Sequence, residues 1–305
     1  ATEAGSRAVI ESEWGVQVQH ALFAVLALPA TALLGWRLAA LARAYEAKRF
    51  SDVQLLARAW WLMVVGLAAL EILTSHAKPA AGVIGCALSA LLLGPLQRLV
   101  FTRADIVGDA PPRRTLLLLR VFGFRARTER LFDRVGARWR WHGPVTMIAA
   151  PDVAARTIDA VDFMRWLLGR IDDTFVRTGS ELAARLAGSD TARDPDGRFR
   201  VNDLCCADDT WRASVVELMQ RADAVLMDLR GMSRERKGCE FELEQLGARI
   251  DPARVVLVVE PAANRSAFAS LLGAAAAGVT WHELPERSGA STAALADALL
   301  AAAER

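Results

Sequence analysis

The sequence predicts a two-part protein, in which an N-terminal bundle of three transmembrane helices precedes an α/β domain built on a parallel sheet. Three long apolar stretches occur before residue 102. After residue 112, short apolar runs alternate with amphipathic helical patterns, which is typical of parallel strands joined by crossover helices. The 305 residues are enough for about two domains. We therefore expect a membrane domain at 1–101, a linker at 102–112 and an α/β domain with five to six strands at 113–305.

The three apolar stretches are residues 21–42, 59–75 and 80–101. A helix needs about 20 apolar residues to cross the hydrocarbon core of a bilayer, so each stretch is close to a spanning length. The second stretch carries Glu71, the one ionisable side chain well inside a predicted span. Glu71 belongs either to a polar cluster that senses something outside the membrane or to a side chain that snorkels to the interface.

Small residues spaced four apart in the third stretch favour close helix packing or oligomerisation. They are Gly82, Cys86 and Ala90.

Basic residues near the first connection set the predicted orientation. Cytoplasmic loops are enriched in Lys and Arg, and the second connection offers only His76 and Lys78. The residues flanking the first connection are Arg37, Arg43, Lys48, Arg49 and Arg58. We expect an integral protein of the plasma or inner membrane, with its N-terminus outside and its α/β domain in the cytoplasm. The arginines that follow residue 102 suit contact with the anionic membrane lipids of that leaflet.

Apolar runs and amphipathic patterns predict the elements of the α/β domain. The predicted strands are residues 115–122, 145–149, 199–205, 224–229, 254–259 and, more weakly, 279–283. The predicted helices are residues 127–139, 160–176, 209–221, 239–250, 265–276 and 292–303. Residues 188–198, rich in Gly, Asp and Pro, predict an exposed loop.

Charge and motif content exclude several function classes. Residues 1–101 hold 8 of the 37 Lys and Arg and 6 of the 35 Asp and Glu, which leaves 29 of each sign in the polar part. Without a basic surplus, binding to nucleic acid lacks its main electrostatic source. The four cysteines form no CxxC and the four histidines no HExxH, so we expect no metal site. Neither GxGxxG, GxxxxGK[ST] nor GxSxG is present at the positions that nucleotide redox enzymes, P-loop hydrolases and serine hydrolases require.

A ligand crevice is expected beyond the carboxyl ends of the strands, as in other open parallel sheets. Several of the residues there also have structural explanations, because Asp208 or Asp209 suits a helix N-cap and Gly123 a turn. The candidate substrate-binding residues at this edge are Phe122, Gly123, Asp152, Asp208, Trp211, Asp228 and Arg230.

One segment resembles the second half of a Toll/interleukin-1 receptor (TIR) domain. The strand at 224–229 is followed by Ser233, by Cys239-Glu240-Phe241-Glu242-Leu243 at the start of a helix, and by the strand at 254–259. The resemblance implies a flavodoxin-like fold, in which Glu242 is the catalytic residue of NAD-cleaving members and Ser233 and Cys239 line the substrate site. Gly238 stands where this family usually has Trp. The same stretch is similar to nucleoside deoxyribosyltransferase-like domains, which also break N-glycosidic bonds.

One carboxylate is sufficient for the implied chemistry. NAD cleavage passes through an oxocarbenium-like state, and the leaving nicotinamide is cationic at the start, so no strong general acid is needed. The alternative for Glu242 is a solvated carboxylate on a helix face, paired with Arg249 or Arg236.

The resemblance predicts a membrane-anchored effector that cleaves NAD or a related nucleotide on self-association, with no cofactor and with a role in bacterial defence or stress. The membrane helices and the TIR-like domain would both contribute to a homo-oligomer, since a membrane raises local concentration. Two alternatives remain open. One is a non-enzymatic signalling or assembly module, and the other is a sensor that binds a nucleotide without cleaving it.

Overall fold

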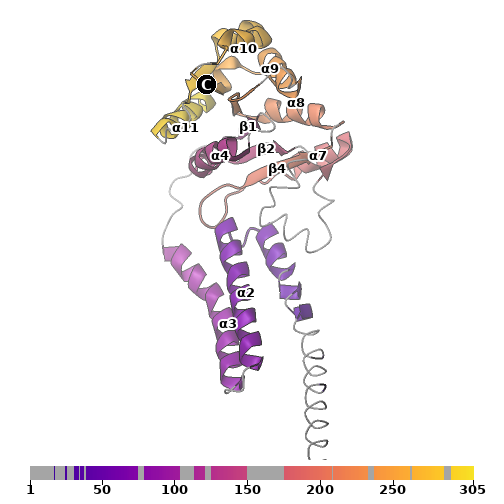
Figure 1. Ribbon diagram of the computed structural model, residues 1–305, viewed down its shortest axis with the longest axis vertical. Coiled ribbons are helices and arrows are strands. Elements are labelled where there is room, and N and C mark those ends of the chain that lie inside the picture. The colour runs from indigo at the N-terminus through magenta and orange to yellow at the C-terminus, as the bar shows by residue number, and fades with distance from the viewer. Residues whose placement is uncertain are drawn as a thin grey trace, which may run out of the picture.

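The computed structural model describes most of both parts of the chain (Figure 1). The described residues are 17, 25, 31–33, 35–37, 39–74, 79–103, 113–120, 125–149, 175–207, 209–232, 237–261, 263–284 and 290–305.

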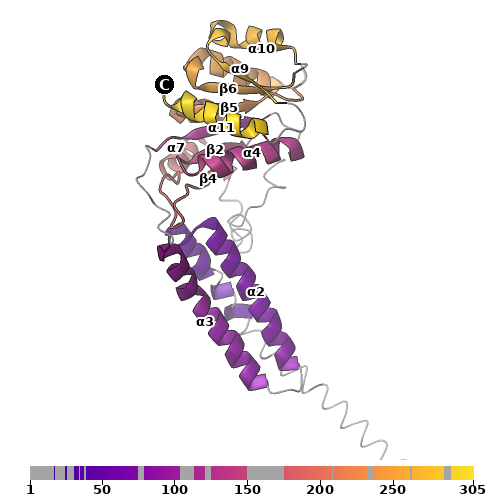
Figure 2. The ribbon, with the colours of Figure 1, turned by 90° about the vertical axis from the view of Figure 1, so that its left-hand side faces the viewer.

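Two long helices lie side by side below the α/β domain in both views (Figures 1 and 2). They are α2 (Asp52–Thr74) and α3 (Pro79–Arg103). Within the described part of the chain, one helix is long and apolar enough to cross a membrane, over Asp52–Ile72. The apolar stretch of α3, Ile84–Gln97, is shorter. Most of the first predicted span, residues 21–42, lies outside the described residues.

Gly82 allows α3 to approach α2 closely. A Cβ added to Gly82 would lie 2.6 Å from a side-chain carbon of Ile72. Farther along the pair, the Nε of Arg58 donates to the Oε1 of Gln97 at 2.5 Å. The two helices are therefore packed together at both a small residue and a polar contact.

The α/β domain is built on a parallel sheet of seven strands in the order β3-β4-β2-β1-β5-β6-β7. All the pairings between neighbouring strands are parallel. The strands are β1 (Leu116–Arg120), β2 (Val145–Ala149), β3 (Phe175–Val176), β4 (Val201–Cys206), β5 (Ala224–Asp228), β6 (Val255–Val259) and β7 (Thr280–Glu283). Strands β2, β3 and β4 lie on one side of β1, and β5, β6 and β7 lie on the other. The strand order therefore reverses between β1 and β5.

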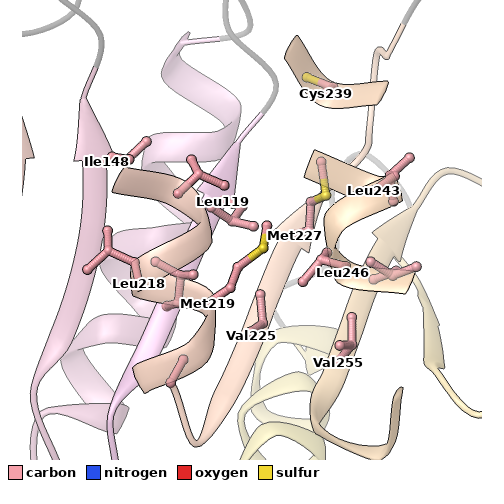
Figure 3. Packing of buried hydrophobic residues seen from close by; sticks show 14 of the residues in the cluster. Leu119, Ile148, Leu218, Met219, Val225, Met227, Cys239, Leu243, Leu246 and Val255 are labelled. Carbon is pink, nitrogen blue, oxygen red and sulfur yellow. The ribbon is translucent and has the colours of Figure 1, made fainter. Parts of the chain in front are cut away.

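Helices cover both faces of this sheet. The helices of the domain are α4 (Arg125–Trp139), α7 (Gly179–Ala187), α8 (Trp211–Arg221), α9 (Lys237–Arg249), α10 (Arg265–Leu272) and α11 (Ala290–Ala303). One apolar cluster takes side chains from α7, α8, α9 and α10, and Figure 3 shows part of it. The other cluster takes side chains from α4 and α11, which face the viewer in Figure 2.

The central strands are apolar along their whole length because helices cover them on both sides. Every residue of β5 and β6 is buried. Along β5 the side chains alternate, so Val225 and Met227 join the cluster under α8 and α9, whereas Ala224 and Leu226 join the cluster under α4 and α11. On α8 the buried positions follow helical spacing, at Ser214, Val215, Leu218 and Met219.

The structure confirms the six predicted strands and corrects the count to seven. Phe175 and Val176 form the edge strand β3, so the end of the helix predicted at 160–176 is wrong there, and residues 160–174 lie outside the described part. Two residues are too few to show a strand pattern, and they pair with β4 alone.

Helix α7 was not predicted, although its sequence carries a helix start signal. Thr178 accepts from the backbone N–H of Glu181 through its side chain, and Glu181 accepts from the backbone N–H of Arg177. This Ser/Thr-x-x-Glu pattern is typical of a capping box.

The segment at 188–198 is a loop, as its composition predicts, but it is only partly exposed. Asp194 and Asp196 are buried, at 3% and 4% exposure. Asp196 is paired with Arg198 at 2.6 Å, and Asp194 contacts Lys48 and Arg200. Burial of these carboxylates is stable because each has a cationic partner, which composition alone does not reveal.

Gly247 gives a stability prediction that reverses the usual helix preference. An alanine inside a helix normally stabilises it by about 1 kcal/mol over glycine. A Cβ at position 247 would lie only 2.4 Å from the backbone oxygen of Leu272, at the contact between α9 and α10. We therefore expect Gly247→Ala to lower the melting temperature of the full-length protein, whereas Gly136→Ala in α4, where nothing lies within 4 Å, should not. An equal effect of the two substitutions on thermal unfolding would contradict this packing.

Candidate functional site

The candidate site lies at the carboxyl edge of the sheet, near the point where the strand order reverses. There the last residues of two neighbouring strands, Arg120 and Asp228, are in register. Helix α9 follows β5 and therefore begins at this edge, which places Glu242 in the second turn of α9. Ligands of open parallel sheets bind in the crevice beyond such an edge.

Asp228 is held by a buried ion pair. Its Oδ1 and Oδ2 accept from the Nε and Nη2 of Arg230, both at 2.7 Å, and Oδ2 also accepts from the hydroxyl of Thr128 in α4 at 2.8 Å. Asp228 is 1% exposed and Arg230 4%. Gly231 follows with a φ of 71°, a conformation that favours glycine. The pair fixes the turn after β5.

Glu242 is buried without a polar partner. It is 1% exposed, and neither carboxylate oxygen has a hydrogen-bond partner among the described residues. Burial raises the pKa of Glu242 from 4.5 to about 8. At neutral pH the side chain is therefore mainly an uncharged carboxylic acid.

The alternative of a solvated Glu242 on a helix face is wrong. Glu242 shares the buried face of α9 with Cys239, Leu243 and Leu246. The Nε of Arg249 donates to the Oε1 of Gln245 instead, at 2.7 Å, and Arg236 lies outside the described residues.

Aromatic side chains lie beside the first turns of α8 and α9. The rings of Trp211 and Phe241 are 5.6 Å apart, and the guanidinium of Arg212 lies 5.4 Å from the centroid of Phe241. A Cβ at Gly238 would be 3.5 Å from the Trp211 ring. The buried Nε1 of Trp211 has no hydrogen-bond partner in the described part of the chain. This edge thus holds a buried indole donor and a buried carboxyl group on neighbouring helices.

Cys239 is buried at the start of α9, beyond Met227 in the direction in which β5 runs (Figure 3). Cys206, at the end of β4, is buried as well, and its burial raises the pKa of the thiol. Neither cysteine has the exposure that a reactive thiolate requires.

The structure brings some predicted site residues together and separates others. Trp211, Cys239 and Glu242 share the face covered by α8 and α9. Asp228 lies on the opposite face, because residues 224, 226 and 228 alternate with 225 and 227 and because its partner Thr128 belongs to α4. Arg230 stays with its partner Asp228, and the other five predicted residues lie outside the described part of the chain. They are Phe122, Gly123, Asp152, Asp208 and Ser233.

Thr128, which donates to Asp228, is not among the site residues predicted from the sequence. No motif marks it, since its role depends on a contact with a residue 100 positions away.

Comparison with known proteins adds no relative. No protein-family model matches the chain, and no curated protein matches it. Among the residues that the structure describes, no group of three or more His, Cys, Asp and Glu side chains could hold a metal ion.

Proposed function

We propose that the protein is a membrane-anchored, TIR-like effector that cleaves the N-glycosidic bond of NAD or a related nucleotide when it self-associates. The observation that carries the proposal is the carboxyl group of Glu242, which is buried beside the carboxyl edge of the sheet with no hydrogen-bond partner among the described residues. Burying a carboxyl group without hydrogen bonds costs free energy, and such groups cluster at functional sites.

The strand order supports a nucleotide-binding fold. Without the two-residue strand β3, the order β4-β2-β1-β5-β6-β7 is the 3-2-1-4-5-6 order of doubly wound nucleotide-binding sheets. The five strands β2-β1-β5-β6-β7 alone have the flavodoxin-like 2-1-3-4-5 order, which the TIR-like resemblance implies. In both, ligands bind at the edge where α9 begins.

The side chains near Glu242 suit the chemistry of N-glycosidic cleavage. An ionised Glu242 would stabilise the positive charge that develops on the ribose, and Trp211 would stack on a ring of the substrate. Trp211 lies next to Gly238, and so its ring stands beside the position where TIR domains usually carry Trp.

The buried position of Glu242 implies that the proposed activity requires a rearrangement. A carboxyl group that is 1% exposed does not reach a substrate, and its pKa of about 8 keeps it mainly uncharged at neutral pH. We propose that the described arrangement is the resting one and that self-association exposes and ionises Glu242. The membrane region, proposed to have three spans with the N-terminus outside, would hold the domain at the cytoplasmic face of the plasma or inner membrane and favour this association.

The test is release of nicotinamide from NAD by the full-length protein, reconstituted in vesicles at increasing density. We expect release to rise with density, and Glu242→Ala to lower the rate by on the order of a hundredfold or more. The matched control is Glu244→Ala, because Glu244 is an exposed carboxylate on the same helix. Turnover that survives Glu242→Ala would assign catalysis to another residue.

A non-enzymatic assembly module is the second candidate. It is favoured by the burial of Glu242 and by the buried ion pair of Asp228 with Arg230, because neither carboxylate is exposed to a substrate. Self-association without any nicotinamide release at every density would select this candidate. Titration calorimetry with NAD distinguishes a sensor from both, since a sensor would bind without turnover.

A further inference from the structure

The segment Tyr45–Asp52, which directly precedes and begins α2, contacts residues at the amino edge of the sheet. Figures 1 and 2 show α2 beginning below the α/β domain. We call these contacts the α2 joint. On the domain side, the joint consists of Arg140 after α4, the acidic side chains of the 188–198 segment, and Arg200 before β4. It lies at the end of the sheet opposite to Glu242.

Arg200 is the centre of the α2 joint. It is 7% exposed, and its Nη2 donates to the backbone oxygens of Tyr45 at 2.8 Å and Phe50 at 3.3 Å. Its Nε donates to the Oδ2 of Asp194 at 2.9 Å, and its guanidinium lies 3.5 Å from the centroid of the Tyr45 ring. The backbone oxygen of Arg200 accepts from the N–H of Val145, the first residue of β2. Arg200 thus binds the segment before α2 through its side chain and the start of β2 through its backbone.

Lys48, which precedes α2, makes a second connection to the domain. Its Nζ lies 2.5 Å from the Oδ2 of Asp190 and 3.2 Å from the Oδ1 of Asp194, and it donates to the backbone oxygen of Ala192. The φ of Lys48 is 57°, a left-handed conformation that costs free energy for a residue with a Cβ. The ionic contacts hold the backbone in this conformation.

Asp52, the first residue of α2, makes the third connection. Its Oδ1 accepts from the hydroxyl of Tyr45 at 2.5 Å, and its Oδ2 is paired with the Nη2 of Arg140. Arg140 also donates through Nε to the backbone oxygen of Phe199 at 2.5 Å. The start of α2 is therefore fixed to the end of α4 and to the residue before Arg200.

A small apolar cluster completes the α2 joint. Tyr45, Phe50 and Leu55 are at most 6% exposed, and the guanidinium of Arg58 lies 4.6 Å from the centroid of the Phe50 ring. Buried cation and aromatic contacts of this kind define a single geometry, whereas a flexible tether would leave these groups in water.

We propose that the α2 joint is a rigid coupling. The α/β domain then moves together with α2 as one body, and no flexible linker separates them. The geometry that carries the proposal is three separate sets of contacts between this segment and the domain. Lys48 contacts the acidic side chains of the 188–198 segment, Asp52 pairs with Arg140, and Arg200 donates to the backbone before α2. A rotation or tilt of α2 is then imposed on the amino ends of β2 and β4. This coupling is independent of whether the domain cleaves a nucleotide.

The test is a distance measurement by pulsed electron paramagnetic resonance on the full-length protein in nanodiscs. Spin labels at Glu46→Cys and Ala184→Cys, both exposed positions, report the separation of the segment before α2 from α7. The background carries Cys86→Ser, since the other three native cysteines are buried. We expect a narrow distance distribution in the unperturbed joint.

Charge reversal tests the cause of that narrow distribution. Arg140→Asp should broaden it by opposing Asp52, and the double variant Asp52→Arg, Arg140→Asp should narrow it again. The matched control is Arg221→Asp on α8, which breaks the exposed pair with Glu217 and should leave the distribution unchanged. A broad distribution in the unperturbed protein, or a narrow one that Arg140→Asp leaves unchanged, overturns the proposal.

Discussion

Glu242→Gln is expected to make the stability of the protein less dependent on pH and to stabilise it in mildly alkaline solution. The carboxyl group of Glu242 is buried without a hydrogen-bond partner in the described part of the chain, and burial raises its pKa from 4.5 to about 8. Glutamine has nearly the same shape and no charge at any pH. It therefore removes the ionisation while keeping the volume of the side chain.

The direction of the pH effect follows from the two pKa values of Glu242. Below pH 4.5 the carboxyl group is protonated in both the folded and the unfolded protein, and its ionisation does not affect stability. Between pH 4.5 and about 8 the unfolded chain releases the proton and the folded chain keeps it. In this range Glu242 lowers the free energy of unfolding by about 1.4 kcal/mol per pH unit. Above that range its contribution is constant.

Thermal unfolding of the full-length protein in detergent, followed from pH 5 to pH 9, measures this effect. The melting temperature of Glu242→Gln should exceed that of the unsubstituted protein increasingly as the pH rises, and the difference should level off above about pH 8. Glu244→Gln, an exposed change on the same helix, should give a difference that does not vary with pH. A constant difference for Glu242→Gln would mean that Glu242 is solvated in the folded protein.

Arg200→Ala is expected to lower the free energy of unfolding by about 3 to 5 kcal/mol, the cost typical of breaking a buried ion pair from one side. The substitution leaves the Asp194 carboxylate buried, with Lys48 as its remaining cation, and removes the donors to the backbone of Tyr45 and Phe50. It also removes the guanidinium that lies over the Tyr45 ring.

Denaturant unfolding of the full-length protein measures the loss, and two further variants identify its cause. The double variant Asp194→Leu, Arg200→Met should recover much of the stability, because an apolar pair needs no compensating charge. Arg221→Ala, which breaks the exposed pair with Glu217 on α8, should cost at most about 1 kcal/mol. Equal losses for Arg221→Ala and Arg200→Ala would show that Arg200 is not buried in the α2 joint.

The sequence predicted the strands of the α/β domain because buried parallel strands are apolar over their whole length. The run at 145–149 coincides with β2, and the runs at 224–229 and 254–259 contain β5 and β6. The same reasoning failed for β3, whose two residues pair only with a neighbouring strand. The polar composition of the 188–198 loop also gave no indication that two of its carboxylates are buried.

The candidate site was predictable only in part. The chain order placed Asp228 and Glu242 at the same edge, but the alternation of β5 turns Asp228 towards α4, and the helical face of α9 turns Glu242 towards the opposite cluster. A strand and a helix have different side-chain periods, so residues that are close in sequence diverge in space.

The sequence by itself determined the apolar runs and the helix periodicity, since these depend on local composition and spacing, whereas Glu242 was singled out by the TIR-like resemblance. The tertiary structure alone decided that Glu242 is uncharged at neutral pH and that Arg200 joins the domain to α2. Both properties arise from groups brought together across long stretches of chain, where burial sets the cost of a charge and the neighbouring side chains decide whether that cost is compensated.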